Sequence, residues 1–216
     1  MKWKMLSKLP KKTTVYCKSC FEEIRDYNFH SIFNYQTICN KCLNISNPQF
    51  IKFKILNYDA LYIYNYDENQ KEKFLLYKQY GDYELKDYFI KNYLIELKIK
   101  FHDYIVLPAP SYIDRDKKRG YNPIIEILRD LNLKIDDCFV KTKNIEQKKL
   151  SFKERENIGN FIEIKKDNLI KGNKVLIVDD LITSGSTIKA LIKLTEKEGP
   201  KDIKILTIAK TINENK

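Results

Sequence analysis

The stretch that decides the fold is Val175-Leu-Ile-Val-Asp179-Asp180-Leu-Ile-Thr183-Ser184-Gly185-Ser186-Thr187. Its consecutive aliphatic residues, bounded by polar ones, predict a strand covered on both faces, as in a parallel sheet. The strand is expected to end at Asp179 and Asp180, and a helix is expected from about Ile188. Ligands of open α/β sheets lie just beyond the carboxyl ends of such strands. The two carboxylates therefore mark a candidate site.

The turn between this strand and helix, Thr183–Thr187, has the composition of an anion-binding loop. Gly185 allows close backbone approach, and hydroxyls beside the N–H groups of a helix start favour a phosphate. A simple helix cap is the commoner reason for serine and threonine before a helix. The whole run favours the phosphate site, because two carboxylates able to hold a diol or a hydrated cation stand beside the turn.

This run resembles the motif with which type I phosphoribosyltransferases bind 5-phosphoribosyl 1-diphosphate (PRPP). The shared pattern is a hydrophobic strand, Asp-Asp, two residues and then Thr-Ser-Gly-Ser-Thr. The resemblance implies that Asp179 and Asp180 hold the ribose 2′ and 3′ hydroxyls and act at the catalytic centre. The residues that it implies for binding the 5′-phosphate are Thr183, Ser184, Gly185, Ser186 and Thr187.

Length and charge point to a globular domain with a small basic module. The chain has 216 residues, 43% of them hydrophobic, which is enough for a core. Of the net charge of +11, the first 58 residues carry +7, from ten Lys and Arg against three acids. This asymmetry predicts a polyanionic partner for the N-terminal module. A chain that is merely rich in lysine throughout is the open alternative.

The sequence favours a cytoplasmic protein. It has no apolar run near the ~18 residues that cross a bilayer, and its first residues lack the apolar core of a signal peptide. Five cysteines in a reducing compartment indicate a metal site or free thiols rather than disulfides.

Two Cys-x-x-Cys pairs, Cys17/Cys20 and Cys39/Cys42, are separated by eighteen residues. The spacing predicts a closed, structural zinc site with four thiolates, and a module of residues 1–57 that folds around the metal. Four unrelated thiols and a redox pair are the alternatives. His30, between the pairs, could ligate but is expected to be a loop residue.

Residues 58–216 are expected to form the α/β domain, with a hood rich in tyrosine and lysine over about 58–100. A strand is expected at Asp59–Tyr66 and helical structure at Tyr83–Lys98. Residues 72–80 fit either a strand or a helix. The interleaved aromatic and basic side chains could stack on single-stranded nucleic acid, but ordinary packing in a hood is the favoured explanation.

The remaining pattern alternates strands and helices, which predicts a parallel sheet flanked by helices. Its strands are expected at 103–111, 136–143, 161–164 and 203–209, with a helix at 124–131 and a helix stop at 198–200. Cys138 is interpreted as a core residue. The basic run that contains Arg115, Lys117, Lys118 and Arg119 could hold a diphosphate or be a solvated face. Residues 141–157 are expected to form a mobile loop near the site.

In order, the motifs along nearly the whole chain resemble the ComF (ComFC) family of bacterial competence proteins. Besides the cysteine module and the phosphate loop, they are Pro-x-Pro-x-x-x-x-Arg-x-x-x-Arg-Gly-Tyr-Asn and Gln-x-x-Leu-Ser-x-x-x-Arg-x-Asn. Tyr121 stands where phenylalanine is usual. Pro123 stands where a longer polar residue is common in the family, so one contact that the family makes next to the basic run is not expected here. The matching positions are Pro108, Pro110, Arg115, Arg119, Gly120, Asn122, Gln147, Leu150, Arg155, Asn157, Asp179, Asp180, Thr183, Gly185 and Thr187.

The resemblance implies a phosphoribosyltransferase fold and a role in natural transformation, on the cytosolic side of DNA uptake. It implies PRPP with Mg²⁺ as ligand, Arg119 and Arg115 on the diphosphate, and single-stranded DNA as a further partner. As protein partners the resemblance implies the competence helicase and the membrane channel, with recruitment of the chain to the inner face of the membrane. The residues identify no acceptor pocket and no general base. A metabolic phosphoribosyltransferase (a transferase for an unidentified amine or nucleobase) and an adaptor without ligand therefore stay open.

Overall fold

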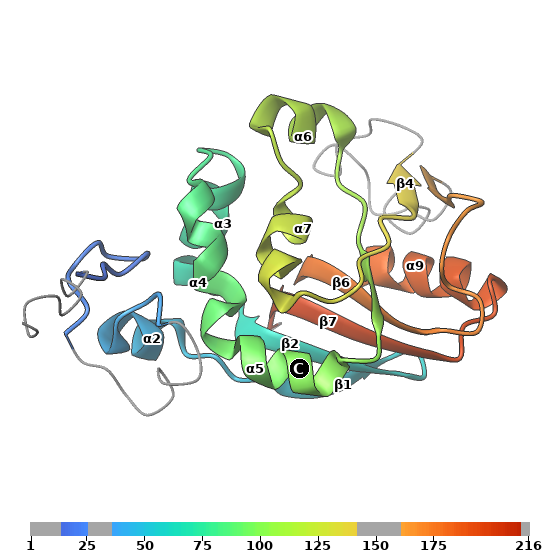
Figure 1. The fold of residues 1–216 in the computed structure, drawn as a ribbon, viewed down its shortest axis with the longest axis horizontal. Coiled ribbons are helices and arrows are strands. Elements are labelled where there is room, and N and C mark those ends of the chain that lie inside the picture. Colours follow the sequence, from blue (N-terminus) through green and yellow to red (C-terminus); the bar gives the residue numbers. More distant parts are fainter. Residues whose placement is uncertain (1–13, 26–35, 142–160, 213–216) are drawn as a thin grey trace, which may run out of the picture.

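The computed structural model describes residues 14–25, 36–141 and 161–212 (Figure 1). Their helices and strands, in chain order, are α2 Asn40–Ser46, β1 Ile51–Ile55, β2 Tyr58–Asn65, α3 Glu68–Lys78, α4 Lys86–Ile90, α5 Leu94–Phe101, β3 Ile105–Pro108, α6 Ile113–Arg119, α7 Pro123–Leu128, β4 Phe139–Lys141, β5 Ile162–Ile164, β6 Lys174–Ile182, α9 Ser186–Lys197 and β7 Asp202–Lys210. Short 3-10 turns lie at Tyr83–Leu85, Lys91–Tyr93 and Arg129–Leu131.

The core is a five-stranded sheet in the order β1-β2-β7-β6-β3. Strands β2, β7, β6 and β3 are parallel, and β1 pairs antiparallel with β2 at the edge. In β6 the residues Val175–Val178 are fully buried, because β3 and β7 flank the strand and helices cover the sheet. The predicted parallel α/β sheet is confirmed, and a buried strand of this kind needs the continuous aliphatic run that the sequence has.

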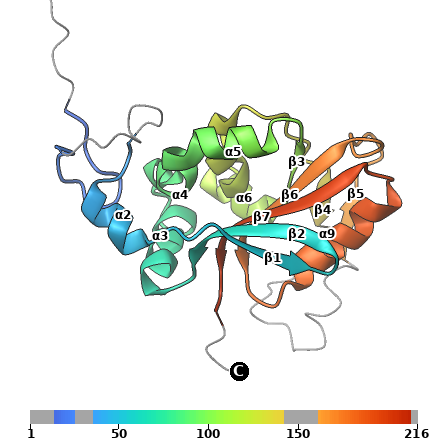
Figure 2. The same cartoon turned by 90° about the horizontal axis from the view of Figure 1, so that it is seen from below.

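Helices lie on both faces of this sheet. Figure 2 shows α5 on one side and α9 on the other. Helix α9 turns Ile188, Leu191 and Ile192 inward, all fully buried, and this 3–4 residue spacing is that of an amphipathic helix. The hydroxyl of Tyr58 in β2 donates to Glu196 of α9 at 2.8 Å. The helix that begins at the candidate phosphate loop is therefore held firmly against the sheet.

The prediction that the central strand ends at Asp179 and Asp180 is wrong. Strand β6 continues to Ile182, with Asp179 opposite Thr207 and Ile182 opposite Lys210 in β7. The backbone of both acids is thus held in the sheet, since β7 is equally long. The turn that follows is shorter than the sequence suggests.

The strand expected at Asp59–Tyr66 is confirmed as β2, but its expected place in a hood needs correction, because it pairs with β7 and lies within the sheet. A second expected strand is shorter than predicted. Of the expected strand at 136–143, residues 142 and 143 lie outside the described part; within residues 136–141 the strand is Phe139–Lys141, and it pairs antiparallel with β5 in a separate two-stranded sheet. The division of the chain after residue 57 stays a prediction; β1, which precedes it, also joins the main sheet.

Most of the other expected elements are found in the structure, and one expected helix is divided. Residues 68–78 are helical, which settles the ambiguous segment at 72–80, while the predicted helix at 83–98 is broken into α4, α5 and short 3-10 turns. The strands at 161–164 and 203–209 are found at β5 and β7, and α9 ends at Lys197. In the part of the chain that the structure describes, no helix has the length and apolar character needed to cross a bilayer.

Candidate functional site

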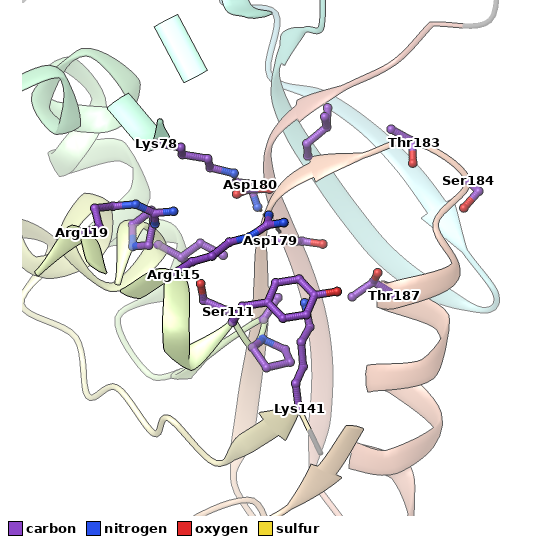
Figure 3. A pocket seen from close by; sticks show the side chains of 16 residues that line it. Lys78, Ser111, Arg115, Arg119, Lys141, Asp179, Asp180, Thr183, Ser184 and Thr187 are labelled. Atoms are coloured by element: carbon purple, nitrogen blue, oxygen red, sulfur yellow. Dashed lines mark hydrogen bonds and ion pairs between the residues drawn. The ribbon is translucent and has the colours of Figure 1, made fainter. Parts of the chain in front are cut away.

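A cavity of about 400 Å³ opens where β3 and β6 meet the helices that follow them (Figure 3). This is the position in which open α/β sheets bind their ligands. The side chains that line it come from segments far apart in the chain. They are Lys78, Ala109, Pro110, Ser111, Tyr112, Arg115, Arg119, Pro123, Ile124, Lys141, Asp179, Asp180, Leu181, Thr183, Ser184 and Thr187.

One end of the cavity is the turn between β6 and α9. Gly185 has φ 73° and caps the helix, a left-handed conformation that disfavours side chains. A Cβ atom there would meet the Cδ1 of Ile55 at 3.0 Å. The hydroxyls of Ser184 and Ser186 lie 2.8 Å apart. The turn therefore presents hydroxyls and the first N–H groups of a twelve-residue helix, which is the arrangement that binds phosphate.

The acid pair lies in the middle of the cavity. The backbone N–H of Asp180 donates to Asp179 Oδ1 at 2.9 Å, which fixes the orientation of that carboxylate. Burial raises the pKa of Asp179 to about 6, while Lys78 and Lys141 oppose the increase. The carboxylate of Asp180 forms an ion pair with the ammonium group of Lys78. Asp179 is thus oriented to accept a hydrogen bond from a hydroxylated ligand, whereas Asp180 is engaged by Lys78.

Cations occupy the other end. Lys78 ends α3, Arg115 and Arg119 come from α6, and Lys141 ends β4. Figure 3 shows Lys78, Arg115 and Arg119 on the side of the acid pair that faces away from Thr183 and Ser184, and Lys141 below the pair, beside Thr187. Four cations against two acids leave an excess charge of +2 among the lining residues.

Neighbouring groups hold these cations in place. Arg119 pairs with Asp116 at 3.5 Å, and Asp116 also accepts from the hydroxyl of Ser111 at 2.7 Å. The Arg115 guanidinium lies 5.0 Å from the centre of the Tyr112 ring, and the Lys141 ammonium lies 4.1 Å from it. Two of the four cations therefore contact the same aromatic ring, and the Arg119 guanidinium lies 5.6 Å from the centre of the Tyr121 ring.

Most site residues expected from the sequence meet at this cavity. Arg115, Arg119 and the acid pair line it with Thr183, Ser184 and Thr187, while Gly185 and Ser186 shape the turn. Residues 142–160, which include Gln147, Leu150, Ser151, Arg155 and Asn157, lie outside the described residues.

Sequence reasoning missed two lysines and a serine, which are Lys78, Lys141 and Ser111. Lys78 lies about one hundred residues before the acids and belongs to no local motif, so only the fold brings it to the site. Lys141 is expected from the sequence where a strand passes into a loop, with no role in the site. Its pKa is lowered by burial, which Asp179 opposes, and this marks it as part of the cavity.

A second cluster consists of Cys17, Cys20, Cys39 and Cys42, whose sulfur atoms all lie within 4.8 Å of one another. The sulfurs of Cys20 and Cys39 are 3.8 Å apart, and tetrahedral coordination with zinc–sulfur bonds of about 2.3 Å places sulfurs at about that separation. The N–H of Cys39 donates to the Cys17 sulfur at 3.3 Å, a contact that favours a thiolate. All four cysteines are free, and the cluster fits a metal ion.

The cysteine cluster is tied to the 3-10 turns at Tyr83–Leu85 and Lys91–Tyr93. The N–H of Thr37 donates to Asn92 at 3.1 Å, and the ammonium group of Lys18 pairs with Glu84. Burial raises the pKa of Cys42 to about 12. That thiol must lose its proton when a cation binds, so metal binding is expected to weaken as the pH falls.

The fold and the cavity define a phosphoribosyltransferase domain, and the family model "Phosphoribosyl transferase domain" matches residues 118–216. The chain is 30% identical to competence protein ComFC of Streptococcus pneumoniae over 150 residues, which are 68% of this chain and 66% of that protein. It is 25% identical to ComFC of Bacillus subtilis over 128 residues, 58% of this chain and 53% of that one.

The chain is thus homologous to the ComFC competence proteins. The matches span between about half and two thirds of these relatives' length. Among solved structures, adenine phosphoribosyltransferase from Rhodothermus marinus is 18% identical, with a TM-score of 0.37 over 59% of this chain and 80% of that one.

Proposed function

We propose that the protein binds PRPP in this cavity and acts in natural transformation, where it handles incoming single-stranded DNA in the cytosol. The observation that carries the proposal is the order of groups across the cavity. A turn suited to phosphate, an acid pair and the cations Lys78, Arg115 and Arg119 follow one another, in the order of the phosphate, the ribose and the diphosphate of PRPP.

In the proposed complex the 5′-phosphate accepts hydrogen bonds from the turn at Thr183–Thr187. Asp179 and Asp180 accept hydrogen bonds from the ribose hydroxyls, while Arg115 and Arg119 neutralise the diphosphate. Two carboxylates beside a diphosphate also suit Mg²⁺, which would screen the leaving group and keep most of its waters. If the bond from C1 to diphosphate breaks, the acids stabilise the positive charge that develops on the sugar.

A calorimetric titration of Mg²⁺–PRPP tests this proposal. The wild-type protein is compared with the variant that carries both Asp179→Asn and Asp180→Asn, and with Asp103→Asn as a matched surface control. Binding that is retained by the control and lost in the double variant is expected. Binding that survives in the double variant would place PRPP elsewhere, and no binding to the wild type would leave a fold that serves as an adaptor.

We further propose that the metal of the cysteine cluster is zinc. Four sulfur ligands that close the coordination shell are typical of structural zinc, so the ion would hold the two cysteine-bearing segments together. One zinc per chain, released by a thiol-blocking reagent, is the expected result. A stoichiometry near zero in protein purified without chelator would refute it.

The DNA-handling part rests on the homology with competence proteins and on the +7 charge of the first 58 residues. Contacts between lysines and phosphates release counterions, so the affinity for a single-stranded oligonucleotide should fall steeply with salt. An affinity that does not change between about 50 and 200 mM salt would contradict direct electrostatic binding.

The candidate site also suits a metabolic phosphoribosyltransferase, because the turn and acid pair are complete. Release of diphosphate from PRPP in the presence of one particular amine or nucleobase, lost in Asp180→Asn, would favour that activity. If no acceptor in a broad panel leads to release of diphosphate, the result would favour the transformation role, with PRPP as a bound ligand.

A further inference from the structure

Among the residues that line the cavity, Lys78 is the one cation that comes from α3, the helix between β2 and β3 in the chain. Its side chain is 27% exposed, and its ammonium group pairs with Asp180. The same group lies 5.1 Å from the centre of the Phe74 ring, one turn earlier on the helix. Helix α3 therefore holds a lysine over an acid that is proposed to bind ribose.

This pairing competes with the ligand. A carboxylate that binds a ribose hydroxyl must direct a lone pair at it, and in the described structure Asp180 directs its carboxylate at an ammonium group. Displacing the ammonium would leave a partly buried charge without a partner, which is costly. A ligand that takes Asp180 must therefore offer Lys78 a new acceptor.

The surroundings restrict what that acceptor can be. Burial lowers the pKa of Lys78 to about 8; Asp179 opposes this, and Arg119, Lys141 and Arg115 add to it. These neighbours show that Lys78 belongs to the cationic end of the cavity as well as to the acid pair. Its flexible stem and rotatable ammonium group suit a change of partner, and the excess charge of +2 favours a doubly anionic group.

We infer that Lys78 is a positioning residue that exchanges Asp180 for the diphosphate when PRPP binds, and so makes the site selective for PRPP over ribose 5-phosphate. The inference rests on the proposed binding of PRPP. Ribose 5-phosphate carries no diphosphate, so it meets an Asp180 that Lys78 still occupies. PRPP supplies the acceptor and releases the acid.

The test is a pair of titrations, with PRPP and with ribose 5-phosphate, on Lys78→Met, which keeps the length of the side chain and removes the charge. We expect the affinity for PRPP to fall about tenfold or more, and the affinity for ribose 5-phosphate to stay or to rise. Lys78→Arg should keep most of the preference for PRPP. Lys71→Met is the matched control, because Lys71 lies on the same helix and pairs with Glu68 at 3.1 Å on the surface.

The ratio of the two affinities separates this role from a merely structural one, because loss of a structural residue would weaken the binding of both ligands to the same extent. Equal losses for both ligands, or no loss for PRPP, would overturn the inference while leaving PRPP binding in place. Absence of PRPP binding to the wild type would overturn the proposed function, and the inference with it. In a protein that already carries Asp180→Asn, adding Lys78→Met should not raise the affinity for ribose 5-phosphate. A rise in that affinity would also contradict the exchange.

Discussion

Asp179→Asn is expected to stabilise the unliganded protein while it removes PRPP binding. Burial raises the pKa of this carboxyl from 3.8 to about 6, so the fold disfavours its charged form. Asparagine has the same shape and no charge. Its side-chain oxygen can still accept from the N–H of Asp180, which the aspartate accepts at 2.9 Å.

The size of the gain follows from the pKa. A shift of about two units corresponds to about 3 kcal/mol between the charged and neutral forms. Because the carboxylate lies at an open cavity and keeps some contact with water, screening reduces this, and we expect about 1–2 kcal/mol at pH 7.5. For a chain of this size that raises the unfolding temperature by roughly 3–6 °C.

The sign of the pH dependence is also fixed. A carboxyl whose pKa is raised by folding does not lower the stability below about pH 3.8, where it is protonated in both the folded and the unfolded state. Its full destabilising effect applies above about pH 6, where it is ionised in both. The advantage of Asp179→Asn should therefore be complete at pH 7.5, shrink as the pH falls through 6, and vanish near pH 4.

Thermal unfolding followed by circular dichroism from pH 4 to 8 measures this. Asp103→Asn is the control, because Lys174 holds the pKa of that exposed carboxyl below its usual value, and its loss should lower stability at neutral pH. An Asp179→Asn protein that is less stable than wild type at pH 7.5 would refute the reasoning. So would a gain in stability at pH 4 that is as large as the gain at pH 7.5.

Three other changes have defined outcomes. Arg119→Ala should weaken PRPP binding more than ribose 5-phosphate binding, and equal losses in calorimetry would mean that it does not contact the diphosphate. Gly185→Ala should lower the free energy of unfolding by about 1–3 kcal/mol. The loss should be larger than for Gly172→Ala, because both glycines have positive φ but only at Gly185 would the added Cβ meet a side chain. Equal losses of stability in chemical denaturation would contradict this. A zinc chelator should unfold the cysteine module, seen as faster proteolysis there, and Cys138→Ser should leave zinc content unchanged.

The central part of the fold could be predicted because its signals are local. The aliphatic run, the acids and the loop composition lie within thirteen residues, and periodicity located β2, β7 and α9 to within a few residues. The cysteine spacing likewise predicted a cluster that the structure assembles.

What the sequence could not supply depends on contacts between distant segments. Strand β6 runs past Asp179 because β7 provides partners as far as Lys210, and nothing in the local run reports the length of its neighbour. The position of β2 in the sheet and of Lys78 in the cavity likewise arise from pairing across more than one hundred residues.

A crystal structure of the protein with PRPP and Mg²⁺ tests the central claim most directly. We predict the 5′-phosphate on the turn Thr183–Thr187, the ribose hydroxyls on Asp179 and Asp180, and the diphosphate among the cations, with Lys78 closer to it than to Asp180. A ligand that lies outside the cavity, or with its diphosphate on the turn, would contradict the account.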